Sequence, residues 1–166
     1  MNHHTDHDPT RDLSFERTVA LPPAAIWAAW TQPEQLMPWF CPRPWTTVAC
    51  EIDLRPGGLF RTVMRSPEGQ EFPNVGCYLE VVPERRLVWT NALAPGFRPV
   101  PASAAEGFFF FTAIVSLAPQ GAGTRYGARV VHATPADRDQ HAAMGFEAGW
   151  GKALEQLVEF VKARGG

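Results

Sequence analysis

The sequence is short of cysteine, of charge and of long apolar runs. Its three cysteines, Cys41, Cys50 and Cys77, form no CxxC pair, so the spacing indicates neither a zinc site nor a disulfide framework. No apolar run approaches the roughly 20 residues that a membrane-spanning helix needs. Charged residues make up 19% of the chain and the net charge is −2, which does not favour binding to nucleic acid or to an anionic membrane. We therefore expect a cytoplasmic protein with reduced thiols.

The sequence motifs of common enzyme classes are also missing. There is no P-loop, no GxGxxG and no HExxH in the chain. None of its four serines lies in a GxSxG elbow, and no cysteine has a recognisable activating neighbour. We expect no metal and no cofactor, and the sequence leaves open whether the protein is an enzyme.

The length and composition of the chain indicate one globular domain. The chain has 166 residues, of which 45% are apolar, and this is enough to bury a single core. Residues 1–11 are polar and hold three histidines, so we expect a flexible tail before a domain over residues 12–163. Such a tail can chelate metals adventitiously, but no second ligand cluster supports a specific site.

Alternating apolar and polar residues predict an antiparallel sheet of six or seven strands. The expected strands are residues 12–21, 46–54, 59–65, 70–82, 87–92, 107–118 and 124–132. Turns of hairpin length separate most of them and imply antiparallel pairing. Residues 94–106 are rich in proline and alanine and are expected to form a long loop. The run Phe108–Phe111 favours a strand that is covered on both faces.

Two short helices and one long helix are expected around this sheet. Pro22-Pro23 favours a first short helix over residues 24–30, and residues 33–40 favour a second. Apolar residues spaced by three and four predict one helix of about 27 residues over positions 136–163. It is the only predicted element long enough to cover a face of the sheet. The fold class is therefore α+β, with a curved sheet wrapped around a long C-terminal helix.

Short motifs that match a known family are spread over most of the chain. They are Phe15-Glu16-Arg17, Trp27–Phe40, Pro56-Gly57-Gly58, Gly76–Thr90, Gly123–His132 and Met144–Leu154. Together they resemble the helix-grip fold of the START-like, or SRPBCC, superfamily, which includes birch-pollen-allergen-like proteins. Within it, the sequence is most similar to the bacterial subfamily named after the activator of the heat-shock-protein ATPase. The resemblance implies a hydrophobic cavity between sheet and helix, but no single reaction, because this fold hosts many functions.

His132 and Glu147 are the candidate polar pair of such a cavity. Strand parity places His132 on the same face as Tyr126 and Val130, and helical spacing places Glu147 in line with Trp150. If the two side chains meet, the carboxyl pKa rises through burial and the pair can orient a ligand or act as acid and base. In the alternative interpretation, Glu147 lies in water and His132 is a satisfied residue at a strand end.

Aromatic side chains are the main candidates for the cavity wall, although most of the six tryptophans suit a core equally well. The resemblance places the cavity mouth at a second short helix near Trp39. The expected ligand contacts are Trp39, Phe40, Trp45, Phe60, Met64, Tyr78, Trp89, Phe108, Phe110, His132, Met144, Glu147 and Trp150. The parity of residues 108–111 is ambiguous, so either the even or the odd pair of phenylalanines can face inward.

Three functions are compatible with these features. The first is a carrier, sensor or sequestering protein that binds a small hydrophobic or aromatic molecule. The second is an enzyme similar to polyketide cyclases or aromatases, in which His132 and Glu147 are the candidate catalytic residues. The third is a co-chaperone or regulatory interaction module. The eukaryotic activator carries a further domain, and the lack of room for it in this sequence argues against this third function. Exposed sheet edges also leave a homodimer open.

Overall fold

The structure is a computed structural model that describes residues 7–105 and 108–165 of the chain. Residues 1–6, with two of the tail histidines, and residues 106–107 and 166 lie outside the described part. Seven strands form one antiparallel sheet in the order β1-β9-β8-β5-β4-β3-β2. The strands are β1 (Asp12–Val19), β2 (Thr46–Ile52), β3 (Leu59–Arg65), β4 (Glu71–Val82), β5 (Arg86–Thr90), β8 (Phe111–Gln120) and β9 (Gly123–His132).

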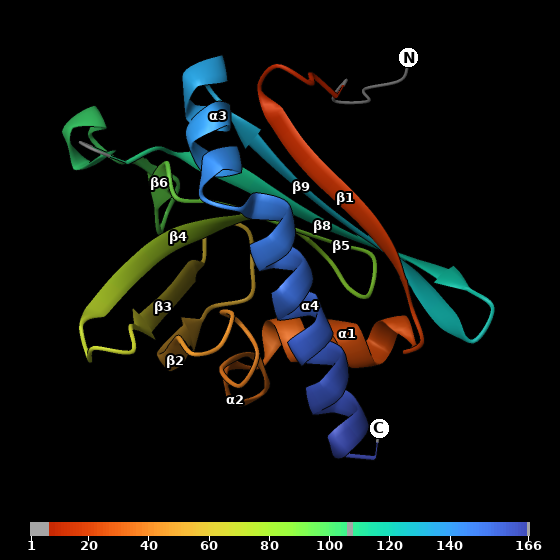
Figure 1. Cartoon of the computed structure of the whole chain (residues 1–166). Helices are drawn as coiled ribbons and strands as arrows, with labels where there is room; N and C mark the ends of the chain where they lie inside the picture. The colour runs from red at the N-terminus through yellow and green to blue at the C-terminus, as the bar shows by residue number, and fades with distance from the viewer. Residues whose placement is uncertain (1–6, 106–107, 166) are drawn as a thin grey trace.

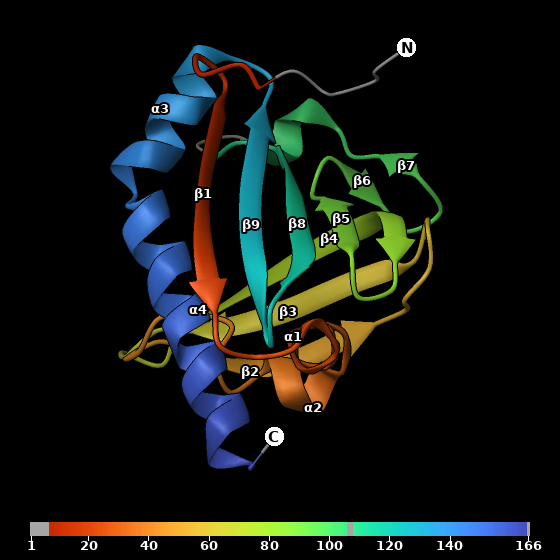
Figure 2. The same ribbon diagram turned by 90° about the vertical axis from the view of Figure 1, so that its right-hand side faces the viewer.

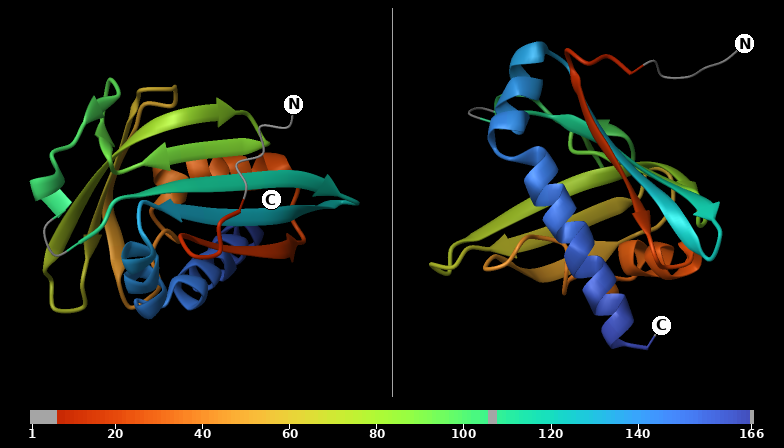
Figure 3. Two further views of the ribbon diagram at one scale, coloured as in Figure 1. Left: turned by 90° about the horizontal axis from the view of Figure 1, so that it is seen from above. Right: turned by 45° about the vertical axis from the view of Figure 1, so that its right-hand side comes forward.

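The helices lie on the concave side of this sheet, which curves around the C-terminal one (Figures 1 and 2). They are α1 (Pro23–Thr31), α2 (Pro33–Leu36), α3 (Pro135–Ala143) and α4 (Phe146–Ala163). The two short helices follow β1, and α4 runs across the sheet in the right-hand view of Figure 3. The predicted α+β class, the strand number and the two short helices are confirmed. None of the helices in the described part is long and apolar enough to cross a bilayer.

Strand β9 shows why the sheet has one buried face. Thr124, Tyr126, Ala128, Val130 and His132 are all buried, and the residues between them are more exposed. Because successive side chains of a strand point to opposite faces, this alternation fixes which face packs against the helices. The prediction that His132 shares the inner face with Tyr126 and Val130 is confirmed.

The prediction of a single helix over residues 136–163 is wrong. The chain leaves α3 at Met144 and begins α4 at Phe146, and between them Gly145 adopts a φ of 86°. The Gly145 N–H donates to the carbonyl of Ala142, as is typical of a left-handed residue that ends a helix. The apolar spacing continues across this break, so periodicity alone does not reveal it.

The prediction of a strand that contains Phe108–Phe111 is also wrong in its bounds. Strand β8 begins only at Phe111, and Phe108 precedes it with half of its surface exposed. Phe109 is buried instead, at 2% exposure, so the odd phenylalanine and not Phe108 faces inward. The expected loop over residues 94–106 contains three short elements, β6 (Leu93–Ala94), β7 (Arg98–Pro99) and η1 (Ala102–Ala105).

Candidate ligand site between the sheet and helix α4

A cluster of aromatic rings occupies the interior between the sheet and the helices. Trp30 packs against Trp39 and Trp89 with ring centroids 4.9 and 5.2 Å apart. Phe60 continues the cluster, 5.2 Å from Trp89 and 5.3 Å from Tyr78. All five rings are buried. The predicted contacts Trp39, Phe60, Tyr78 and Trp89 therefore lie together on the inner side, where they pack against one another as core residues.

The concave face becomes exposed toward one end of strands β2, β3 and β4. The register pairs Thr47 with Met64 and Met64 with Phe72 at this end. Phe72 is 40% exposed and Trp45 is 37% exposed, and their rings lie 5.5 Å apart. We call Trp45, Met64 and Phe72 the open end. Large apolar side chains that lie partly in water and continue into a core are typical of a binding surface.

One wall of this region is the segment between α2 and β2, which is tied to α4 through Gln156. The Gln156 Nε2 donates to the carbonyl oxygens of Trp39 and Cys41 at 3.2 and 2.8 Å. Its Oε1 accepts from the Arg43 N–H at 2.9 Å. Gln156 is only 2% exposed, so these bonds compensate for burying its amide. The segment that carries Phe40 and Trp45 is thereby fixed to the helix.

Gln156 was missed in the sequence, although a signal for it exists. It follows Ala153 by three residues and stands beside Leu154 and Leu157 in the apolar stripe of α4. A polar residue on a buried helical stripe needs a hydrogen-bond partner. Which backbone groups supply that partner depends on the fold.

The polar group deepest in the aromatic cluster is the hydroxyl of Tyr78. Tyr78 is 0% exposed, and its hydroxyl has no hydrogen-bond partner within residues 7–105 and 108–165. Burial, with a smaller contribution from Cys50, raises the pKa of this hydroxyl far above neutral. Burial and the charges of Glu51 and Glu34 also raise the pKa of Cys50, to about 11. Both groups are therefore neutral at physiological pH.

The opposite end of the inner face contains a buried histidine pair. His132 Nε2 and His141 Nδ1 are 2.9 Å apart, and His132 Nδ1 lies 2.7 Å from the carbonyl oxygen of Arg11. Since a carbonyl only accepts, His132 Nδ1 donates to it, and a neutral His132 then accepts the Nδ1 proton of His141. Burial, and then His132, lower the pKa of His141 to about 4. Phe109 packs on both imidazole rings.

The candidate pairing of His132 with Glu147 is not found in the structure. The Glu147 side chain is 71% exposed and lies 3.5 Å from Arg17, whereas the partner of His132 is His141. Met144, beside the helix break, is also 61% exposed, whereas Phe146, the first residue of α4, is buried. Neither Met144 nor Glu147 reaches the inner face. The alternative interpretation, with Glu147 in water and His132 satisfied at a strand end, agrees with the structure.

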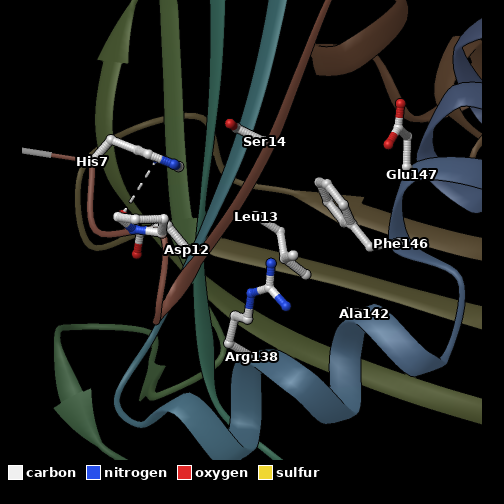
Figure 4. Close-up of a pocket in the computed structure, with 9 residues that line it drawn as sticks. His7, Asp12, Leu13, Ser14, Arg138, Ala142, Phe146 and Glu147 are labelled. Atoms are coloured by element: carbon white, nitrogen blue, oxygen red, sulfur yellow. Dashed lines mark ion pairs between the residues drawn. The ribbon is translucent and has the colours of Figure 1, made fainter.

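Glu147 lies instead on the rim of two surface hollows beside β1. The first, of about 360 Å³, is lined by residues that include Asp12, Arg138 and Phe146. Figure 4 shows Arg138 extending from α3 toward Leu13. The second, of about 490 Å³, has Arg17, Lys152 and Glu155 in its wall. Charged walls do not suit an apolar ligand, so neither hollow matches the expected site.

No part of the described structure provides an evident metal site. Within residues 7–105 and 108–165, no three His, Cys, Asp or Glu side chains are grouped closely enough to hold a metal ion. The three cysteines are free thiols. The aromatic cluster offers apolar contact and hydrogen bonding by a neutral group, the Tyr78 hydroxyl.

The same combination of sheet and helices is found in known proteins. The family model described as activator of Hsp90 ATPase homolog 1-like protein matches residues 20–162. The chain belongs to this family. The resemblance seen in the sequence is thus confirmed, and the fold of this family commonly binds hydrophobic ligands. None of the curated proteins compared with the chain matches it.

Solved structures of this family type are similar over nearly the whole chain. A crystal structure of a protein from Nitrosomonas europaea is 45% identical, covers 95% of this chain and 98% of that one, and has a TM-score of 0.89. A crystal structure of a protein from Rhodobacter sphaeroides is 26% identical over 95% and 97% of the two chains, with a TM-score of 0.78. An activator-like protein from Aeromonas hydrophila, 22% identical over 93% and 94%, supports the fold alone, with a TM-score of 0.69.

Proposed function

We propose that the protein binds a small apolar molecule, aromatic at least in part, at the open end of the inner face, as a carrier, sensor or sequestering protein. The observation that carries this proposal is the pair Trp45 and Phe72. These two rings contact each other and remain 37% and 40% exposed, and Phe72 lies on β4, the strand that also carries buried Tyr78. A molecule that covered them would remove apolar surface from water at about 25 cal/mol per Å².

The architecture supports binding rather than a simple surface patch. Phe40 packs into the core, with its ring 5.8 Å from both Trp30 and Phe60, and it belongs to the same segment as Trp45. Because Gln156 fixes this segment to α4, the wall is rigid while the Trp45 and Phe72 side chains remain in contact with solvent.

Binding can be tested with N-phenyl-1-naphthylamine, a neutral probe whose fluorescence increases in apolar sites. We expect saturable binding to the wild type. The substitutions Trp45→Ala and Phe72→Ala should each weaken the probe's affinity about tenfold, because each removes a large apolar contact. Fluorescence titration measures both effects.

Val82→Ala is the matched control. Val82 lies on the same strand as Phe72 and is 41% exposed, but its neighbour Val81, not Val82, packs against the core. This variant should bind the probe like the wild type. Lack of saturable binding, or equal affinity in Trp45→Ala, Phe72→Ala and the wild type, would contradict the proposed function.

A further inference from the structure

The Tyr78 hydroxyl is buried in the aromatic cluster without a hydrogen-bond partner in the described part of the chain. Nine in ten or more buried polar groups in proteins form a hydrogen bond. The hydroxyl of Tyr126, in contrast, accepts a hydrogen bond from Trp30 Nε1 at 3.2 Å. Both tyrosines are buried, but the Tyr78 hydroxyl makes no such bond within residues 7–105 and 108–165.

The position of Tyr78 connects this hydroxyl to the open end. On β3 and β4, the pairs Met64–Phe72, Thr62–Asn74 and Phe60–Gly76 follow one another. Tyr78 is the next residue of β4 on the same face, because side chains alternate along a strand. The Tyr78 ring stacks on Phe60 at an angle of 18°. Tyr78 therefore forms the inner limit of the surface that begins at Phe72.

We infer that the Tyr78 hydroxyl donates a hydrogen bond to the ligand, and that the ligand is an aromatic compound with a neutral acceptor such as a ketone oxygen. This inference rests on the proposed function and names its ligand class. A donor buried without a partner is costly, and a ligand acceptor that supplies the partner gains the full benefit of that bond. A hydrocarbon of the same shape would leave the hydroxyl unpaired.

Burial favours a ketone over a carboxylate. The Tyr78 side chain is 0% exposed and stacks on the apolar ring of Phe60. Burying the charge of a carboxylate ligand against a single neutral donor is unfavourable. A ketone accepts one hydrogen bond and carries no charge. The site thus matches an uncharged carbonyl compound.

The test compares 2-acetylnaphthalene with 2-ethylnaphthalene, which share a ring system and differ in a carbonyl group. Affinities for the wild type and for Tyr78→Phe are measured by displacement of N-phenyl-1-naphthylamine. We expect the preference for the ketone over the hydrocarbon to be about tenfold greater in the wild type than in Tyr78→Phe. The thermal midpoint of the free Tyr78→Phe protein should be equal to or above that of the wild type, because the substitution removes an unpaired polar group.

The outcomes separate this inference from the proposed function. If both compounds bind and Tyr78→Phe leaves their affinity ratio unchanged, the inference is overturned and the proposed function stands. If Tyr78→Phe lowers the midpoint of the free protein, the hydroxyl already has a partner, such as a buried water, and the inference fails. If neither compound nor the probe binds the wild type, both proposals fail.

Discussion

The two ends of the inner face satisfy their polar and aromatic groups in opposite ways. At the α3 end, His132 and His141 hydrogen bond to each other, His132 also bonds to the Arg11 carbonyl, and Phe109 closes over the pair. At the open end, Phe72 remains partly in water, and farther along β4 the hydroxyl of buried Tyr78 lacks a partner in the described structure. At the α3 end, contacts within the chain satisfy the polar groups and cover the rings. At the open end, apolar surface remains exposed that a ligand can cover.

This contrast shows how one sheet can hold a stable core and a binding site. The same strands β3 and β4 carry buried Phe60 and Tyr78 and, farther along, exposed Phe72. Stability comes from the part where rings and helices α1 and α4 interlock. Specificity is expected where the packing is incomplete, since only there can a ligand add contacts that the chain does not already make.

The largest expected effect is on the closed part of the interior. Leu157 of α4 is 0% exposed, and Leu157→Ala should lower the free energy of unfolding by about 2–5 kcal/mol. Phe72→Ala removes a larger side chain but should cost no more than about 1 kcal/mol, because Phe72 is 40% exposed. Urea unfolding of both variants measures the difference. Equal losses would mean that the open end belongs to the core.

The histidine pair should make the α3 end sensitive to acid. The folded pKa of His141 is lowered to about 4 from 6.5, so between these values the unfolded chain binds more protons than the folded one. The free energy of unfolding should therefore fall as the pH drops from 6.5 to 4, by at most about 3 kcal/mol. His141→Phe should reduce this slope in unfolding curves recorded from pH 4 to 7. An unchanged slope would show that other groups cause it.

The smallest expected effects concern the helix break that shapes the α3 end. Gly145 has a φ of 86°, so Gly145→Ala should cost about 1 kcal/mol. Gly149 lies within α4, and a Cβ added there would meet no atom within 4 Å. Gly149→Ala should therefore stabilise the protein by up to about 1 kcal/mol. A lower thermal midpoint for Gly145→Ala and a higher one for Gly149→Ala would support the helix break. An increase in both variants would argue for a continuous helix.

Local periodicity explains why most of the fold was predictable. The alternation in β9 and the three- and four-residue spacing in α4 each record one buried face, and a buried face is a property of consecutive residues. The break at Gly145 was not predicted, because the apolar spacing continues on both sides of it. The run Phe108–Phe111 was misassigned because four equal residues carry no alternation.

The candidate site was predictable only in its residue types. The sequence identified Trp39, Phe60, Tyr78 and Trp89 as inner-face aromatics, but it could not say that these rings pack against one another. It offered Glu147 as a candidate partner of His132, whereas the nitrogen beside His132 belongs to His141, which lies on helix α3. Whether Trp45 and Phe72 bind a ligand is a prediction that the titration will test.

By itself, the sequence determined the fold class and the inner face of strands such as β9, because these follow from the order of apolar and polar residues along the chain, and its motifs indicated the family. The tertiary structure decided which side chains meet. Gln156 and the backbone of Trp39–Arg43, the two histidines, and the rings of Trp45 and Phe72 are brought together by packing across elements. Hydrogen bonds and exposure depend on distances in space, and these are set only when the sheet closes on the helix.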